Sequence, residues 1–163
     1  MSVGSIVEAA RRFDVNRVTV TGGEPLAQPE CFPLLRALCD QEFAVSIETS
    51  GALLIDEIDP RVTTVMDLKT PSSGEQHRNL YENLAYLDND DEIKFVVSDR
   101  ADYDWAKATI SEYHLLECVH LLMSPNHEVL HPRELAEWIL EDRLPVRLQV
   151  QLHKYLWGNE PGH

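Results

Sequence analysis

The segment Arg17-Val18-Thr19-Val20-Thr21-Gly22-Gly23-Glu24-Pro25 points to the fold class, because a short β-rich run passes directly into a glycine-rich turn. Residues 17–21 are rich in β-branched side chains, which favour a strand. Two glycines then let the backbone bend and let a ligand approach it closely, and Pro25 stiffens the exit. Glu24 places a carboxylate beside this opening, which suits a small ligand with an ammonium group. A tight strand-to-helix turn with an exposed glutamate explains the local pattern equally well.

Further β-rich runs follow along the chain and alternate with stretches of helical spacing. The predicted strands are residues 17–21, 43–48, 62–68, 93–97, 119–123 and 146–151. The predicted helices are residues 3–13, 32–41, 75–86, 101–112 and 132–141. This alternation requires a parallel sheet with crossover helices, because parallel neighbours cannot be joined by a tight turn. The sequence therefore predicts the α/β class, either an open or partial barrel or a doubly wound sheet, with ligand groups at the C-terminal ends of the strands.

Length and charge narrow the function classes. A chain of 163 residues predicts a single domain over residues 1–163. The formal net charge of −14, from 28 acidic and 14 basic side chains, argues against nucleic-acid binding because such a surface repels a phosphate backbone. The sequence contains neither an apolar run of about 18 residues nor a basic leader followed by an apolar stretch. We therefore expect a cytoplasmic protein with no membrane partner.

Neither the cysteines nor the His127-Glu128-Val129-Leu130-His131 segment has the context of a metal site. Cys31, Cys39 and Cys118 are odd in number and widely separated, which is typical of buried, inert thiols. The histidine segment matches the H-E-x-x-H pattern of zinc hydrolases, which needs a helix to bring both imidazoles to one face. Pro132 disfavours helical dihedrals at the residue before it, so we expect a connection here. A zinc hydrolase stays an alternative hypothesis.

Polar side chains follow other predicted strands as well. Glu48-Thr49-Ser50-Gly51 ends the second strand with hydroxyls and a carboxylate that suit a ribose, although an N-cap and turn cluster has the same composition. Asp67-Leu68-Lys69 ends the third, where a charged pair costs free energy unless the charges meet each other or a ligand. Lys94 lies in the fourth strand, either within the site or as a solvated edge charge. The last strand has a polar face that lines a site or faces solvent at a sheet edge.

In order and content these segments resemble radical S-adenosylmethionine (SAM) enzymes, in which a Gly-Gly-Glu-Pro turn on the second core strand holds the methionine end of SAM. Several segments are further similar to the 7-carboxy-7-deazaguanine synthase family. They are residues 48–51 (ETSG), 67–71 (DLKTP), 94–96 (KFV), 124–125 (SP) and 149–157 (QVQLHKYLW). The resemblance extends over about residues 6–162. It implies a partial (βα)6-type radical SAM barrel.

The resemblance also implies an activity. The family converts 6-carboxy-5,6,7,8-tetrahydropterin to 7-carboxy-7-deazaguanine on the route to queuosine, by a radical ring contraction with loss of ammonia. Its members are carbon–nitrogen lyases that use SAM, a 4Fe-4S cluster and Mg²⁺. The resemblance suggests a homodimer.

Site residues follow from the same resemblance. Thr21 would contact the pterin substrate, and Gln151 and His153 would lie near it. The SAM site would be formed by Gly22, Gly23, Glu24, Glu48, Ser50, Asp67, Leu68, Lys69, Ser124, Pro125 and Asn126. Within this set, the glycine-rich turn would hold the methionine moiety, the end of the second strand the ribose region, and residues 124–126 would lie by the adenine. No catalytic residue is assigned.

One feature of the family is missing from the sequence. Family members carry a CxxxCxxC motif whose three thiolates hold the 4Fe-4S cluster, and the three cysteines of this chain lack that spacing. The first strand of the barrel, the cluster loop and the Mg²⁺ ligand are missing with it. We therefore expect a fragment or a misplaced gene start of a longer enzyme, which does not cleave SAM as given. The alternative is a degenerate paralogue that binds SAM or a purine without reaction.

Overall fold

The computed structural model describes residues 1–127 and 129–158, and a parallel sheet forms its centre. The strands are β1 (Arg17–Val20), β2 (Ala44–Thr49), β3 (Thr63–Asp67), β4 (Glu92–Val97), β5 (His120–Pro125) and β6 (Arg147–Leu148). They lie in the order β1-β2-β3-β4-β5-β6, and every neighbouring pair is parallel. The predicted α/β class is therefore confirmed. Because the strand order never reverses, right-handed crossovers place the connections on one side of the sheet, which is a barrel-like arrangement and not a doubly wound one.

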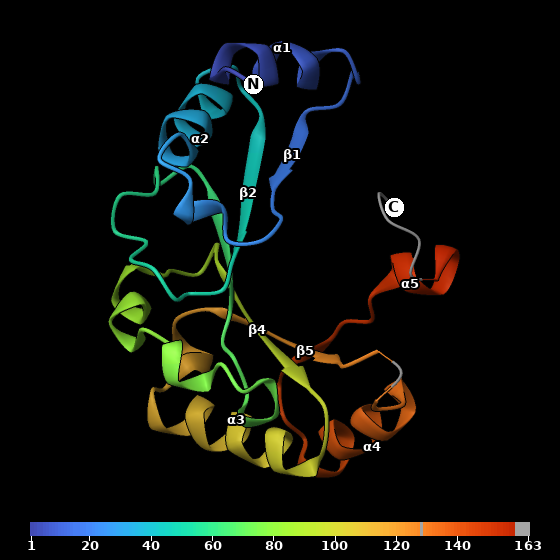
Figure 1. The fold of residues 1–163 in the computed structure, drawn as a ribbon. Coiled ribbons are helices and arrows are strands. Elements are labelled where there is room, and N and C mark those ends of the chain that lie inside the picture. Colours follow the sequence, from blue (N-terminus) through green and yellow to red (C-terminus); the bar gives the residue numbers. More distant parts are fainter. Residues whose placement is uncertain (128, 159–163) are drawn as a thin grey trace.

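Helices cover the outer side of this curved sheet. The helices of the structure are α1 (Val3–Arg11), α2 (Cys31–Cys39), α3 (Arg100–Glu112), α4 (Pro132–Asp142) and α5 (Leu152–Trp157). Figure 1 shows α2, α3 and α4 along the outer side, whereas α5 stands apart at the open end of the sheet. Short 3-10 turns complete the connections: η1 (Pro25–Ala27), η2 (Pro71–Ser73), η3 (Gln76–Arg78), η4 (Tyr81–Tyr86) and η5 (Leu115–Glu117).

The two faces of the sheet differ because side chains alternate along each strand. In β4, for example, Ile93, Phe95 and Val97 are fully buried, while Glu92 and Lys94 between them are only partly buried. The buried face packs on the helices in two clusters, one around Leu35 and Leu38 of α2, the other around α3 and α4. The inner face carries polar side chains and leads to the strand ends where ligand groups are predicted.

The predicted helix over residues 75–86 is wrong. This segment forms the 3-10 turns η3 and η4, after Gly74 has adopted a left-handed φ of 72°. Asn79 and Asn83 are buried, and their side-chain amides bind backbone groups of neighbouring loops. Asparagine competes in this way with the helical backbone for hydrogen bonds, so the helical spacing of the apolar residues was misleading.

The C-terminal part departs from the prediction in length. The strand predicted over residues 146–151 contains only Arg147–Leu148, and the chain turns into α5 at Leu152. Gln149 still donates its N–H to the carbonyl of Met123 at 2.9 Å, so the pairing with β5 continues for one more bond.

The segment around His127 and His131 is a connection, as expected. Residues 127 and 129–130 form turn and bend, and His131 is the N-cap of α4, where its Nδ1 accepts the N–H of Arg133 at 3.2 Å. Glu128, the glutamate of the zinc-hydrolase hypothesis, lies outside the described residues. One imidazole nitrogen is thus used for capping a helix.

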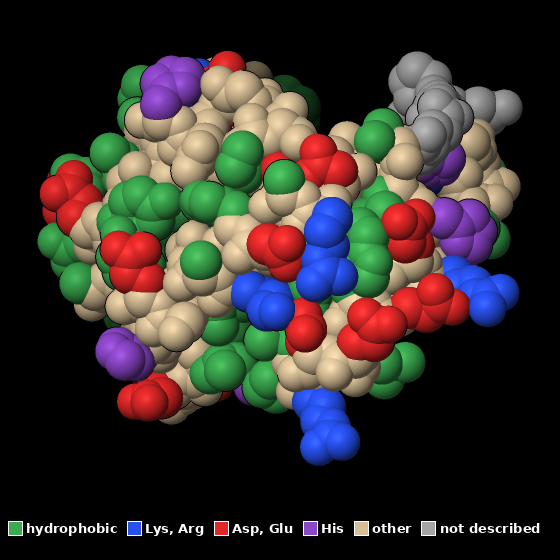
Figure 2. All heavy atoms as spheres, turned by 90° about the horizontal axis from the view of Figure 1, so that it is seen from below, with side chains coloured by type: hydrophobic (Ala, Val, Ile, Leu, Met, Phe, Trp, Pro, Cys, Tyr) green, Lys and Arg blue, Asp and Glu red, His purple; other side chains and the backbone are tan. Residues whose placement is uncertain are grey.

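The outer surface carries charges of both signs. Figure 2 views the molecule from the side of α3 and α4, and acidic and basic side chains alternate there with hydrophobic ones. Ion pairs join Arg100 to Asp104 at 3.0 Å and Arg133 to Glu137 at 2.8 Å. Across residues 1–127 and 129–158, no helix is both long and apolar enough to cross a membrane.

Candidate functional site

The glycine-rich turn after β1 is open to a ligand. Thr21, Gly22 and Gly23 are exposed, and the two glycines have φ values of 100° and 54°. A Cβ atom added at either glycine would meet no atom within 4 Å. The positive φ angles, and not crowding, therefore explain the glycines, and the turn leaves its backbone groups accessible.

Glu24 ties this turn to the end of β2. Its Oε1 accepts the N–H of Leu26 at 3.1 Å and the hydroxyl of Thr49 at 2.9 Å. Its Oε2 accepts the N–H and the hydroxyl of Ser50 at 2.8 and 2.5 Å. An ionised carboxylate offers about four acceptor positions, so these donors occupy all of the acceptor positions of Glu24. A ligand that binds Glu24 must displace one of them, and the rotatable Ser50 hydroxyl is the donor that moves most easily.

The same contacts determine the protonation of Glu24. Burial alone raises the pKa of its carboxyl, but the hydrogen bonds from Ser50, Thr49 and Leu26 outweigh burial and hold the pKa below its ordinary value. Glu24 is thus a carboxylate at neutral pH. It supplies negative charge beside the open turn, as an ammonium-bearing ligand requires.

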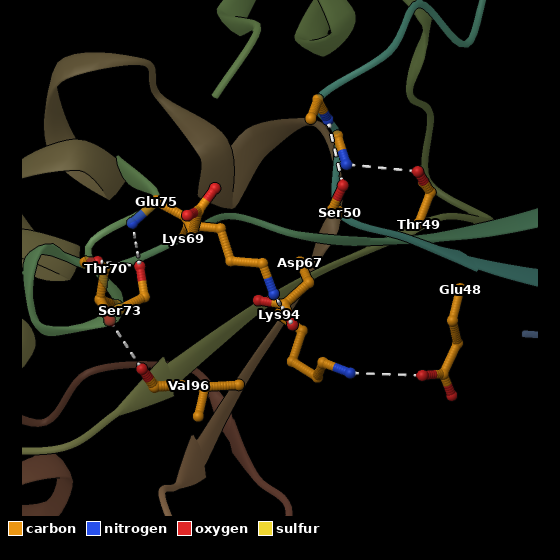
Figure 3. A network of polar contacts seen from close by, with 12 residues as sticks. Glu48, Thr49, Ser50, Asp67, Lys69, Thr70, Ser73, Glu75, Lys94 and Val96 are labelled. Carbon is orange, nitrogen blue, oxygen red and sulfur yellow. Dashed lines mark hydrogen bonds and ion pairs between the residues drawn. The ribbon is translucent and has the colours of Figure 1, made fainter. Parts of the chain in front are cut away.

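A row of charged side chains crosses the inner face from β2 to β4 (Figure 3). The ammonium of Lys94 lies 3.4 Å from Oε2 of Glu48, and that of Lys69 lies 3.0 Å from Oδ2 of Asp67. Asp67 and Lys94 are register partners in β3 and β4, which brings the two pairs side by side. The Oδ1 atom of Asp67 is buried and has no hydrogen-bond partner among the described residues. A buried acceptor without a donor is a candidate contact for a ligand N–H or O–H group.

Two buried asparagines, which were not among the predicted site residues, hold the loops beside this row of charged side chains in place. Asn79 binds the backbone of Lys69 in both directions: its Oδ1 accepts the N–H, and its Nδ2 donates to the carbonyl, each at 2.9 Å. Asn83 is fully buried and binds the loop after β2. The low helix propensity of asparagine, at two positions four residues apart, was the only available signal.

The end of β5 forms a second group. Ser124 and Pro125 are buried, and Asn126 donates its N–H to the carbonyl of Val97 at 2.8 Å and its Nδ2–H to Ser98 at 3.0 Å. A cavity of about 520 Å³ opens between this end and the C-terminal segment. It is lined by Pro125, His127, Val129, Leu130, His131, Pro132, Val150, Gln151, Lys154 and Tyr155.

The predicted substrate residues at the C-terminus lie in different surroundings. Gln151 lines the cavity beside Pro125, and its Oε1 is buried without a partner among residues that the structure describes. His153 is exposed on α5 and is not among the residues that line this cavity. Leu68, from the predicted cofactor set, is buried at 1% exposure, so only its backbone can reach a ligand.

The cysteines are spread over the molecule. Cys31 and Cys39 are buried at the two ends of α2, where burial raises the pKa of each thiol, and Cys118 is exposed after η5. Within the described part of the chain, no three His, Cys, Asp or Glu side chains are grouped so that they could hold a metal ion.

Comparisons with known proteins give a consistent result. A protein from Chlorobaculum tepidum named 7-carboxy-7-deazaguanine synthase is 46% identical over 161 residues, which are 97% of this chain and 73% of that protein. A protein of the same name from Koribacter versatilis is 40% identical and is covered over 70% of its length. No protein-family model matches the chain.

Solved structures agree on the fold. QueE from Escherichia coli superposes with a TM-score of 0.73 at 22% identity, over 93% of this chain and 64% of that one. SuiB from Streptococcus suis, in a structure with S-adenosylmethionine bound, gives a TM-score of 0.65 at 13% identity over 42% of its chain. At these identities the likeness shows the fold alone.

Proposed function

Because the chain belongs to the 7-carboxy-7-deazaguanine synthase family, we propose that it carries the SAM- and substrate-binding core of a carbon–nitrogen lyase of deazapurine synthesis. The reaction is the SAM-dependent radical ring contraction of 6-carboxy-5,6,7,8-tetrahydropterin to 7-carboxy-7-deazaguanine, with loss of ammonia. The observation that carries the proposal is the joining of the glycine-rich turn to the end of β2 through Glu24. Residues 1–163 form one radical SAM core domain in this proposal.

The residues at the strand ends fit SAM. The open turn at Gly22 and Gly23 and the carboxylate of Glu24 match a methionine moiety, which carries an ammonium group. The unpartnered Oδ1 of Asp67 can accept a hydrogen bond from a ribose hydroxyl. When bound together with a one-electron donor, SAM would supply the radical that begins the ring contraction. The chain's own contribution is to bind and orient SAM and the pterin, with Thr21, Gln151 and His153 proposed for the pterin.

The described residues do not fit the 4Fe-4S cluster or Mg²⁺. A cluster of this kind needs three converging thiolates, and Cys31, Cys39 and Cys118 lie at separate places in the fold. The described ranges also hold no other group of metal-binding side chains. We therefore assign no step of the reaction to the cluster or to Mg²⁺, although the family resemblance implies that the complete reaction uses both.

SAM binding tests the cofactor part of the proposal. Calorimetric titration of the chain with SAM is expected to show saturable binding to one site. Replacing Gly23 with valine should abolish it, because the added side chain fills the space beside the open turn. Gly158→Val is the matched control, since Gly158 also has a positive φ and free space around it but lies at the end of α5. A wild-type chain without heat or thermal shift on SAM addition contradicts the proposal.

A second candidate function is a SAM-binding module without chemistry, which the separation of the cysteines favours. Anaerobic incubation of the chain joined to the CxxxCxxC-bearing segment of a family member, with iron, sulfide, a reductant, SAM and the pterin, distinguishes the two. Formation of 5′-deoxyadenosine and of 7-carboxy-7-deazaguanine supports the lyase. SAM binding with neither product supports the binding module.

We also propose a homodimer in which α5 contacts the second copy. Leu152, Tyr155 and Leu156 are 59–64% exposed on this helix, and a concentration of apolar side chains is typical of a contact surface. Light scattering is expected to give twice the 18.6 kDa of the chain. Leu156→Glu should shift the mass to the monomer, and Leu140→Glu, at an exposed leucine of α4, should not. A monomeric wild-type chain at every concentration would refute the dimer.

A further inference from the structure

A cavity of about 310 Å³ at the strand ends contains two cationic side chains. It is lined by Gly23, Ser50, Ala52, Lys69, Glu75 and Arg78. The lining thus carries two positive charges and one negative charge in a chain whose net charge is −14. A positive cavity on an acidic protein attracts an anionic group.

The backbones that carry the two cations are tied to each other through Asn79. Lys69 follows the end of β3, and Asn79 clamps its backbone through two hydrogen bonds of 2.9 Å. Arg78 is the residue next to Asn79, so the same clamp fixes the backbone from which the guanidinium extends. Asn79 is itself only 8% exposed. The fold therefore sets the positions of the two backbones from which the cationic side chains extend into the cavity.

Lys69 and Arg78 differ in their exposure and in the number of hydrogen-bond donors that a ligand can use. The side chain of Lys69 is 30% exposed, and its ammonium lies 3.0 Å from Oδ2 of Asp67. Arg78 is 61% exposed and donates one hydrogen bond, from Nη1 to Oε2 of Glu75 at 3.1 Å. In the described part of the chain this is the single hydrogen bond of the Arg78 side chain, so the other donors of the guanidinium remain available. A planar guanidinium binds a carboxylate with two parallel hydrogen bonds, which an ammonium cannot do.

We propose that Arg78 binds the carboxylate of the methionine end of SAM, and that this carboxylate replaces Glu75 as its partner. The inference rests on the proposed function, because it assigns a further residue to the same site. Gly23 lines the cavity and belongs to the turn that faces the methionine moiety. The ammonium of that moiety then lies towards Glu24 and its carboxylate towards Arg78 and Lys69. An exposed arginine–glutamate pair is weak, so its exchange costs little.

Calorimetric titration with SAM and with decarboxylated SAM, which lacks the carboxylate, isolates this contact. Arg78→Gln is expected to weaken SAM binding roughly tenfold to hundredfold, and binding of decarboxylated SAM by less than about twofold. Arg78→Lys should recover part of the affinity, because lysine keeps the positive charge but cannot form two parallel hydrogen bonds to the carboxylate. Glu75→Gln should not weaken SAM, since it removes the competing carboxylate. Arg133→Gln, at an exposed arginine paired with Glu137 on α4, is the matched control and should change neither affinity.

The outcomes separate this inference from the proposed function. A wild-type chain that binds neither compound contradicts the proposed function and removes the premise of the inference. If wild type binds SAM and Arg78→Gln weakens both compounds equally, or weakens neither, the assignment of the carboxylate to Arg78 is wrong while the SAM site stands.

Discussion

Replacing Asn83 with alanine is expected to lower the free energy of unfolding by about 3–5 kcal/mol, because it leaves buried backbone groups without partners. Asn83 is fully buried. Its Oδ1 accepts the N–H of Ile55 at 3.3 Å, and its Nδ2 donates to the carbonyls of Gly51 and Leu53 at 3.2 and 2.8 Å. One side chain thus satisfies both directions of hydrogen bonding in the loop after β2. Urea unfolding followed by circular dichroism measures the loss.

A control and a local measurement make this prediction specific. Asn89→Ala, at an exposed asparagine nearby in sequence, should change stability by less than about 0.5 kcal/mol. Asn83→Asp keeps the acceptor for Ile55 but turns a carboxylate oxygen towards the carbonyl groups, so it should be no more stable than the alanine variant. Hydrogen exchange of the Ile55 amide should accelerate in Asn83→Ala. A stability within about 1 kcal/mol of wild type would show that water replaces the amide at little cost.

Much of the fold could be predicted from sequence, because β-rich runs and stretches of helical spacing alternate along the chain and this order requires a parallel sheet. Each strand of the structure overlaps a predicted strand, and four of the predicted helices are present with ends shifted by a few residues. The segment over residues 75–86 could not be predicted in the same way. Its spacing of apolar residues is helical, but Asn79 and Asn83 bind loops that are distant in sequence, and no local pattern contains those partners.

The sequence predicts that the candidate site residues lie at one edge of the sheet, but not which hydrogen bonds they form with each other. The polar segments after β1, β2 and β3 lie at one edge of the sheet because the strands are parallel. The sequence did not indicate that Glu24 accepts donors from Thr49 and Ser50, since these contacts depend on how the turn is oriented. It also gave no reason to include Arg78, which lines the cavity at the strand ends because it lies in the 3-10 turn η3 and not in a longer helix.

Replacing Glu24 with glutamine is expected to lower the free energy of unfolding by about 2–3 kcal/mol near neutral pH, because charge-assisted hydrogen bonds are lost. The shape of the side chain is kept, but an amide NH₂ takes the place of one carboxylate oxygen. It then faces donors of Ser50, or of Thr49 and Leu26, and at least one buried donor loses its acceptor. SAM affinity should fall at least roughly tenfold, since the ammonium loses its anionic partner. Glu30→Gln is the control, because Glu30 begins α2 without a side-chain hydrogen bond.

The pH dependence of this effect identifies the charge as its cause. The pKa of Glu24 is lower in the folded chain than its ordinary value, so the carboxylate's contribution to stability is complete above the unfolded pKa of about 4.3. It is lost as the pH falls through the folded pKa, where protonation turns wild type into a neutral side chain as well. The difference in unfolding free energy between wild type and Glu24→Gln should therefore be constant from neutral pH to about pH 5 and shrink below about pH 4. A difference that stays constant through the acid range would show that the shape of the side chain, and not its charge, joins the turn to the end of β2.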